Sequence, residues 1–255
     1  MKTTLRREAL RWSMPSIRTP WRAVSAMFLL NGGLFGVWAS RIPAIAEQHG
    51  LGPGALGGLL LFMAAGAIIA FALAGHAVDR SGAYKVTWRV AVAYSAALFL
   101  IAFATNPLLL GVALFIFGAV HGAMDVAMNA WAGEVERRLG RPVMSSIHAM
   151  FSLGAVLGAS SGFLAANAGA SVPVHFLLAG TVFAVATLAL AYIEWTPEKL
   201  RSGSASPIYS LPGSGLMTVG FVAFCASLGE GAMADWSAIF LVLTTGATKA
   251  DAALG

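Results

Sequence analysis

The sequence predicts an all-α polytopic membrane protein with seven membrane-spanning helices. Of its 255 residues, 58% are hydrophobic and only 11% are charged, whereas a soluble domain has about 25% charged residues. The mean hydropathy is correspondingly high, at +0.78. Seven apolar runs are long enough to cross about 30 Å of hydrocarbon as helices, which takes roughly 20 residues each. We place them at residues 23–43, 56–78, 87–104, 108–131, 143–166, 174–193 and 215–244.

The first run follows a basic segment, and Ala44-Ile45-Ala46 after it has the small residues of a signal-peptide cleavage site. A cleaved secretory signal is therefore an alternative for this span. The run is long for a signal peptide, and Asn31, three glycines and Arg41 interrupt it, which favours a retained helix. Arg41 is expected near the membrane surface, where its long side chain can reach water.

Short segments of turn-forming residues separate several of the spans. Residues 50–54 divide the first two, 105–107 divide the third and fourth, and 170–173 divide the fifth and sixth. These connections predict helical hairpins. The fifth span also carries a face of small residues that predicts close helix packing, formed by Gly154, Gly158 and Gly162.

A polar segment with several prolines and glycines separates the sixth span from the seventh. It predicts a cytoplasmic linker between two helical bundles. The expected organisation is a cytoplasmic tail at 1–22, a six-helix bundle at 23–194, the linker at 195–213, and the seventh helix with the start of a second, truncated bundle at 214–255.

The basic residues predict the orientation, because Lys and Arg are retained on the cytoplasmic side of a membrane. With the N-terminus inside, 14 of the 16 basic residues fall on the cytoplasmic side, and only Arg41 and Lys249 fall outside. We therefore expect a multi-pass protein of the bacterial inner membrane with a cytoplasmic N-terminus. This asymmetry also explains the net charge of +5, so no nucleic-acid partner is expected.

The turn between the second and third spans contains the pattern Gly-x-x-x-Asp-Arg-x-Gly-x-x-Lys, formed by Gly75, Asp79, Arg80, Gly82 and Lys85. Gly75 would permit close helix approach, Asp79 could cap a helix or pair with a basic group, and Gly82 would supply a positive φ. An ordinary basic turn is the simpler alternative. The pattern resembles the gating-loop motif of the major facilitator superfamily, and it lies between the corresponding spans.

Three further segments resemble a bacterial branch of that superfamily akin to the fucose permeases: GVWASRIPAI in the first span, residues 125–159 across the fourth and fifth, and GEGAMADWSAIFL in the seventh. The resemblance implies twelve helices in two pseudo-symmetric halves around a central cavity lined by the first, fourth, seventh and tenth. Since the chain stops where the eighth helix would begin, we expect a fragment. It would hold the six-helix N-terminal bundle plus the first helix of the C-terminal bundle, and the missing helices would be its partner.

Polar groups recur inside the apolar spans. His121, Asp125 and Asn129 share one face of the fourth span together with two glycines, and that face is expected to turn inward. At about 1.5 Å per residue, His121 and Glu230 lie near mid-membrane, with Asn31 close to that depth. A charge there costs about 2.5–3.5 kcal/mol on insertion scales, so it normally faces a partner or a watery cavity. We expect Asp125 and Glu230 to share such a cavity.

Depth and chemistry suggest the role of each residue. His148 lies at about the depth of Asp125, with which it could exchange a proton, so proton coupling is assigned to Asp125, Glu230 and His148. Solute contact is assigned to Asn31, Trp38, His121, Asn129, Asp235 and Trp236.

Alternatives remain for several of these side chains. Asn31 and Asn129 could only join helices, and His148 could bond a neighbouring carbonyl. Trp38 and Trp236 could belong to an interfacial aromatic belt instead of lining a sugar site.

A metal site could in principle combine His121, Asp125 and His148. No Cys/His ligand spacing supports it, so neither a metal nor another cofactor is expected. A nucleophile with its base and a phosphate-binding loop are also missing from the sequence, so we do not expect an enzyme.

The expected function is secondary active transport of a small polar, sugar-like solute, coupled to protons by alternating access. Proton-coupled efflux of drugs or metabolites is the nearest alternative. Drug antiporters of the superfamily usually carry an arginine early in helix four and a Gly-Pro pair in helix five, and both are missing here. An alternative of another class is a membrane sensor or assembly protein that transports nothing. The partners expected besides the rest of the chain are membrane lipid, the solute and protons.

Overall fold

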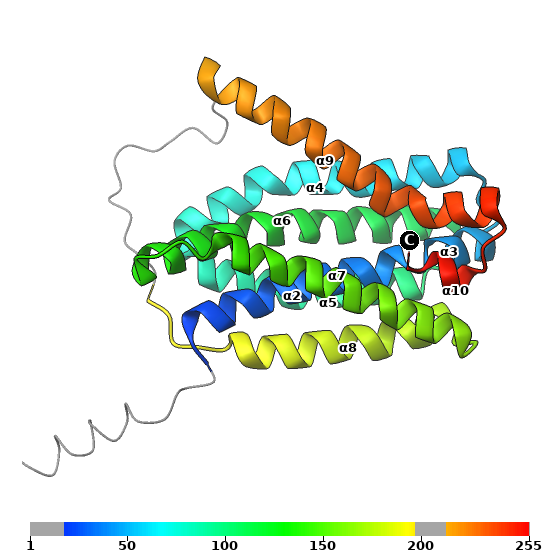
Figure 1. The fold of residues 1–255 in the computed structure, drawn as a ribbon, viewed down its shortest axis with the longest axis horizontal. Helices are drawn as coiled ribbons and strands as arrows, with labels where there is room; N and C mark the ends of the chain where they lie inside the picture. The colour runs from blue at the N-terminus through cyan, green and yellow to red at the C-terminus, as the bar shows by residue number, and fades with distance from the viewer. Residues whose placement is uncertain (1–17, 197–212, 255) are drawn as a thin grey trace, which may run out of the picture.

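The computed structural model describes residues 18–196 and 213–254, and every regular element within them is a helix (Figure 1). The predicted all-α fold is confirmed. Seven of the helices are long and apolar enough to cross a membrane. In chain order the elements are α2 (Pro20–Ala39), α3 (Ile42–Gln48), α4 (Pro53–Ser81), α5 (Ala83–Ala102), α6 (Pro107–Leu139), α7 (Met144–Asn167), α8 (Val172–Ala191), α9 (Ser214–Phe240), the π-helix η1 (Leu241–Thr245) and α10 (Lys249–Ala252).

Most of the N-terminal tail and of the linker expected at 195–213 lies outside the described residues.

Local side-chain chemistry fixes where the helices begin and end. The side chain of Asn106 accepts a hydrogen bond from the amide of Leu109 (2.9 Å), and Pro107 follows at the first helical position of α6. The same helix ends at Gly140, whose φ of +62° is the left-handed conformation that glycine adopts without strain.

Helix α6 runs eight residues past the apolar span expected at 108–131. The added turns carry charged side chains, some of which bind neighbouring segments of the chain. The carboxylate of Glu136 accepts hydrogen bonds from the amides of Val143 and Met144, both at 2.8 Å, at the start of α7. Glu134 accepts from the indole of Trp195 at 2.9 Å, just after α8. The end of α6 thereby anchors both flanking segments.

Helices α2 and α7 pack closely because glycines remove the side chains that would keep their backbones apart. A Cβ placed on Gly154 or Gly158 would overlap the backbone of α2 around Leu29 and Gly33. The close-packing face expected on the fifth span is therefore present.

Glycines also join α4 to α6. A Cβ on Gly118 would overlap the backbone of Met63, and one on Gly122 would overlap that of Ala67. These two glycines thus face α4, although the sequence placed them on the same inward face as His121 and Asp125. The polar residues lie on the adjacent side of the helix.

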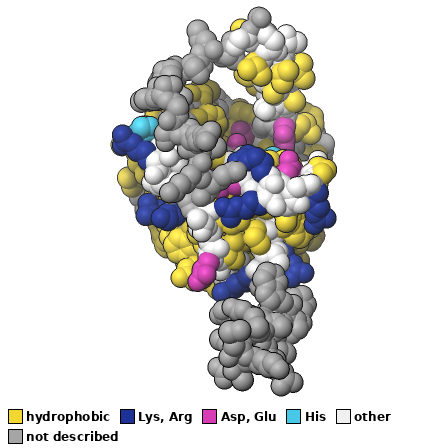
Figure 2. All heavy atoms as spheres, turned by 90° about the vertical axis from the view of Figure 1, so that its left-hand side faces the viewer, with side chains coloured by type: hydrophobic (Ala, Val, Ile, Leu, Met, Phe, Trp, Pro, Cys, Tyr) yellow, Lys and Arg dark blue, Asp and Glu magenta, His cyan; other side chains and the backbone are white. Residues whose placement is uncertain are grey.

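The helices span the molecule from one end to the other (Figure 1). One end carries α3 and α10, and we call it the α3/α10 end. The opposite end carries the α4–α5 and α6–α7 junctions, and Lys and Arg side chains gather over it (Figure 2). We call it the basic end. Helix α9 contacts α3 and α10 and makes a few contacts with α2. Toward the basic end it departs from the other helices (Figure 1).

Candidate functional site

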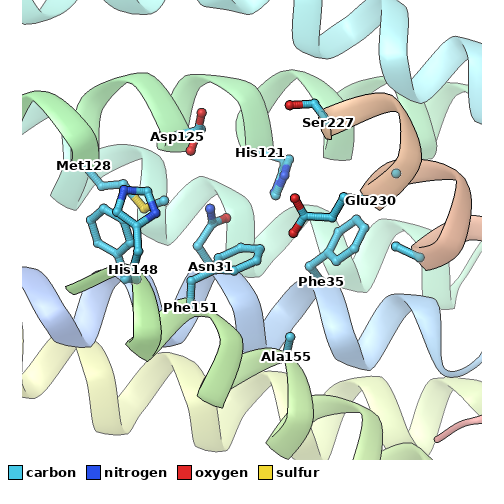
Figure 3. Close-up of a pocket in the computed structure, with 13 residues that line it drawn as sticks. Asn31, Phe35, His121, Asp125, Met128, His148, Phe151, Ala155, Ser227 and Glu230 are labelled. Atoms are coloured by element: carbon cyan, nitrogen blue, oxygen red, sulfur yellow. The ribbon is translucent and has the colours of Figure 1, made fainter. Parts of the chain in front are cut away.

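A cavity of about 540 Å³ lies between α2, α6, α7 and α9 (Figure 3). Both groups expected to share a water-accessible space line it, since Asp125 projects from α6 and Glu230 from α9 (Figure 3). Among the described residues that line the cavity there is no Lys or Arg. The lining is completed by Phe28, Asn31, Phe35, His121, Met128, His148, Phe151, Ala155, Ser227, Gly231 and Ala234.

Asp125 and His148 are joined through a third side chain. The amide nitrogen of Asn129 donates to Oδ1 of Asp125 at 3.0 Å and to the backbone oxygen of Asp125 at 2.9 Å. The amide oxygen of Asn129 lies 3.1 Å from Nε2 of His148. Because an amide oxygen only accepts, Nε2 of His148 is the donor in this arrangement. Direct pairing of His148 with Asp125 is thus replaced by a bridge, and Asn129 forms that bridge without lining the cavity.

His121 is held from two sides. Its Nδ1 lies 2.9 Å from the hydroxyl of Tyr94, a fully buried residue of α5. Its ring stacks on Phe35 of α2, with the centroids 5.4 Å apart and the planes 28° apart. One ring nitrogen is occupied by the tyrosine, so the other is the one available to a bound molecule.

Asn31 lies on the cavity wall and is only 1% exposed. Its amide oxygen has no hydrogen-bond partner among the described residues. A buried polar atom without a partner is uncommon in native structures. In a cavity wall, it can accept a hydrogen bond from a hydroxyl or amine group of a bound molecule.

Besides Asn129, three residues expected to contact solute do not line the cavity: Trp38, Asp235 and Trp236. Trp38 is fully buried against Phe117, with ring centroids 6.2 Å apart, so it neither lines the cavity nor forms an interfacial belt. It is two helical turns from Asn31 toward the α3/α10 end, about 10 Å along the axis, where the bundle core closes.

Asp235 and Trp236 follow Glu230 by five and six residues on α9, which turns them away from its direction by about 140° and 120°. A Cβ on Gly57 would lie 3.5 Å from the Trp236 ring, so this tryptophan packs toward α4. Asp235 is partly buried, does not line the cavity, and its Oδ1 has no partner among the described residues.

The expected gating loop is largely helical. Gly75, Asp79 and Arg80 belong to the last two turns of α4, and Lys85 to the first turn of α5. Gly82 joins them with a φ of +85°, as expected from the pattern. Among the described residues, no atom outside its own helix lies within 4 Å of where a Cβ would sit on Gly75, so the expected close approach of another helix is not seen in that part of the chain. Within the described residues, Asp79 makes neither a cap nor an ion pair.

Sequence reasoning missed most of the apolar wall. Phe28 and Phe35 flank Asn31 at three- and four-residue spacing, so helical periodicity around Asn31 could have found them. No comparable signal marks Tyr94, because its contact with His121 depends on how α5 packs against α6. Among the described residues, no three His, Cys, Asp or Glu side chains converge on a position that could hold a metal ion.

Comparison with known proteins gives matches over nearly the whole chain. Residues 23–255 match the model of the Major Facilitator Superfamily. A protein of Sinorhizobium fredii described as the uncharacterized transporter y4wD is 43% identical over 242 residues, covering 95% of this chain. An uncharacterized MFS-type transporter of Yersinia pestis is 30% identical over 259 residues, and the membrane protein MosC of Rhizobium meliloti is 30% identical over 234 residues. The chain spans 64%, 65% and 56% of these three relatives, respectively.

Proposed function

The chain belongs to the major facilitator superfamily, and from that premise we propose secondary active transport of a small polar solute by alternating access. One observation carries the proposal. Carboxylates from the first bundle and from α9, Asp125 and Glu230, line one cavity together with Asn31 and His121. An apolar bundle that only served as a scaffold would have no need to hold two costly acidic groups at this depth.

Proton coupling is the mechanism that we propose. Protonation of Asp125 or Glu230 removes a charge from the cavity, which changes the relative free energies of conformations that expose it to one side or the other. His148 is exposed and lies one turn from the start of α7 at the basic end, so it can take up a proton there. Asn129 holds His148 and Asp125 in place, and because both line the cavity, the proton can pass between them through water.

In the proposed orientation the basic end faces the cytoplasm of a bacterium, and the N-terminus lies on the cytoplasmic side of the inner membrane. Helix α9 departs from the bundle toward that end (Figure 1), so the conformation described here would open inward.

A sugar-like solute is favoured by the lining of the cavity. Phenylalanine rings form an apolar wall, and Asn31, His121 and the two carboxylates supply hydrogen-bonding groups for hydroxyls. The resemblance to the fucose-permease branch points the same way. A transporter of this kind is not an enzyme, and it needs no cofactor.

The test uses the full-length protein in lipid vesicles. A thermal-shift screen of sugars and polyols identifies a solute, because a ligand that binds the folded state raises its stability. Uptake of that solute should then depend on an imposed pH gradient. Asp125→Asn should abolish the dependence, whereas Glu194→Gln, an exposed carboxylate away from the cavity, should retain it.

Other outcomes would decide against parts of the proposal. Gradient-dependent coupling that survives in Asp125→Asn would remove this carboxylate from the mechanism. Net export of the solute, driven by proton entry down the pH gradient, would establish efflux in place of uptake. Solute binding without any flux in either direction would favour a sensor.

A further inference from the structure

A second cavity, of about 490 Å³, lies at the α3/α10 end of the molecule. One wall comes from the six-helix bundle, through the α2–α3 junction and the end of α7, and the other comes from α10. Its polar lining residues are Ser40, Arg41, Asn167, Thr248 and Lys249.

Arg41 dominates this second cavity. Its side chain was expected to reach water, yet it is only 6% exposed. Nη2 donates to the backbone oxygen of Ala170 at 2.7 Å. Nε and Nη1 are buried and have no hydrogen-bond partner among the described residues, and no described carboxylate forms an ion pair with the guanidinium. A buried charge is costly unless it is paired and hydrogen-bonded, so this group requires an acceptor.

The charges around Arg41 have one sign. No Asp or Glu is among the described residues that line the second cavity, whereas Lys249 adds a second cation. Lys249 forms an ion pair with Glu47, which lies outside the cavity. The carboxylate of Asp251 accepts a hydrogen bond from Thr248 at 2.6 Å, but Asp251 is exposed and not part of the lining.

We propose that the second cavity binds a small oxyanion, a carboxylate or a phosphate group, with Arg41 as its principal ligand. Nε and Nη1, the two guanidinium nitrogens without a partner among the described residues, point along different edges of the group, and either can donate a charge-assisted hydrogen bond to an oxygen of the anion. Burial lowers the pKa of Arg41, yet arginine remains protonated at neutral pH, so the site keeps its charge. Asn167 and Lys249 also line the cavity and can act as secondary donors, although the amide nitrogen of Asn167 already donates to the backbone oxygen of Phe163 at 3.2 Å and Lys249 pairs with Glu47.

The anion site is distinct from the transport cavity and independent of the proposed function. The described lining of the transport cavity contains two carboxylates and no Lys or Arg, so it does not suit an anion. Because the donors of the second cavity come from both the bundle and α10, a bound oxyanion would hold these two parts together.

The test measures the melting temperature of the full-length protein, delipidated in a neutral detergent, at constant ionic strength. Sodium phosphate and sodium acetate should each raise Tm over sodium chloride, by roughly 5 °C near saturation. Arg41→Gln should remove the shift. Arg89→Gln, an exposed arginine at the basic end, should leave it intact.

Lipid and free anion are distinguished by a second arm. If the natural source of the oxyanion is a lipid headgroup, phosphatidylglycerol should raise Tm and reduce the further shift caused by phosphate, and it should do neither in Arg41→Gln. If the source is a free anion, phosphatidylglycerol should leave the phosphate shift unchanged.

Asn167→Ala is a second variant that keeps the test decisive if Arg41→Gln fails to fold. Asn167 is exposed, so the protein should tolerate the loss of its side chain. Its apparent affinity for phosphate should fall about threefold or more, the effect of one lost hydrogen bond. Wild-type protein that shows no shift with either anion would overturn the proposal, as would a full shift in Arg41→Gln. If an acidic side chain of the full-length protein already pairs with Arg41, neither anion should shift Tm, and the proposal would be wrong.

Discussion

At the scale of single residues, Asn129 has a different position from the one expected. Its spacing from Asp125 suggested either solute contact or helix joining. In the structure both ends of its side-chain amide are hydrogen-bonded: the nitrogen donates to Asp125, and the oxygen accepts from His148. The histidine is also fixed by an edge-on contact with Phe28, at a centroid distance of 4.9 Å. A side chain with this geometry positions two titratable groups.

Asn129→Ala should therefore impair proton coupling more than solute binding. Losing hydrogen bonds to charged partners costs about 1.5–3 kcal/mol, so gradient-driven uptake should fall about tenfold or more. Solute affinity without a gradient, measured by thermal shift, should change less than about twofold, because Asn129 does not line the cavity.

Two variants sharpen the interpretation of Asn129→Ala. Ser145→Ala removes an exposed hydroxyl at the start of α7 and should have no effect. His148→Gln can still donate to Asn129 but cannot take up a proton near neutral pH, so the pH dependence of uptake should flatten while solute still binds. A pH profile identical to the wild type would exclude His148 from the proton route.

At the scale of helices, glycine determines which pairs can approach closely. Helices α2 and α7 meet through Gly154 and Gly158, and α4 and α6 meet through Gly66, Gly118 and Gly122. In a membrane, where lipid is as apolar as leucine, such backbone contact is a main source of helix association. These two pairs place Asn31, His121, Asp125 and His148 around one space. The packed helices α2 and α4–α8 are therefore the scaffold for these four side chains.

Gly158→Ala should destabilise the bundle, because the new methyl group would meet the backbone of Gly33. Overpacking of this kind costs about 1–3 kcal/mol, so a lower Tm is expected for the purified protein. Gly58→Ala is the matched control, since no atom of the other described helices lies within 4 Å of the new Cβ. There the higher helix propensity of alanine should leave Tm unchanged or raise it slightly. Equal effects of the two substitutions would contradict the packing described here.

At the scale of the whole molecule, α9 and α10 meet the bundle at one end only. The contacts include α3, α7, a short part of α2 and the start of α4, where Trp236 lies near Gly57, and Lys249 forms an ion pair with Glu47 there. Toward the basic end, α9 stands apart (Figure 1). Under the alternating access proposed above, this asymmetry would correspond to a conformation that is closed at the α3/α10 end.

Reversing one charge of the ion pair should weaken the closed α3/α10 end. An exposed pair is worth at most about 1 kcal/mol, and repulsion reverses its sign, so Lys249→Glu should shift the conformational equilibrium several-fold. Spin labels on α3 and α10 would report the change as a larger population of long distances.

The double variant Lys249→Glu with Glu47→Lys restores opposite charges and should recover the wild-type distance distribution. Failure of this exchange to rescue, with both proteins folded, would show that the pair does not hold the end closed.

The amino-acid sequence by itself determined the membrane-spanning helices, for which length and hydropathy suffice. A constant rise per residue also predicts depths, with His121, Glu230 and Asn31 near mid-membrane and Asp125 closer to the cytoplasm. In the structure these four side chains line one cavity. The concentration of Lys and Arg in alternate connections was also visible in the sequence, and those within the described residues gather at the basic end (Figure 2).

Only the tertiary structure decided which side chains face one another. Rotation of a helix about its axis depends on packing with its neighbours, which spacing along one helix does not reveal. Trp38 and Trp236 therefore turned out to pack against other helices, Asn129 to bridge Asp125 and His148, and Arg41 to be buried. Periodicity shows which residues of one helix lie on the same face of that helix. Which residues of a neighbouring helix lie opposite that face depends on the close contacts that glycines allow between helices.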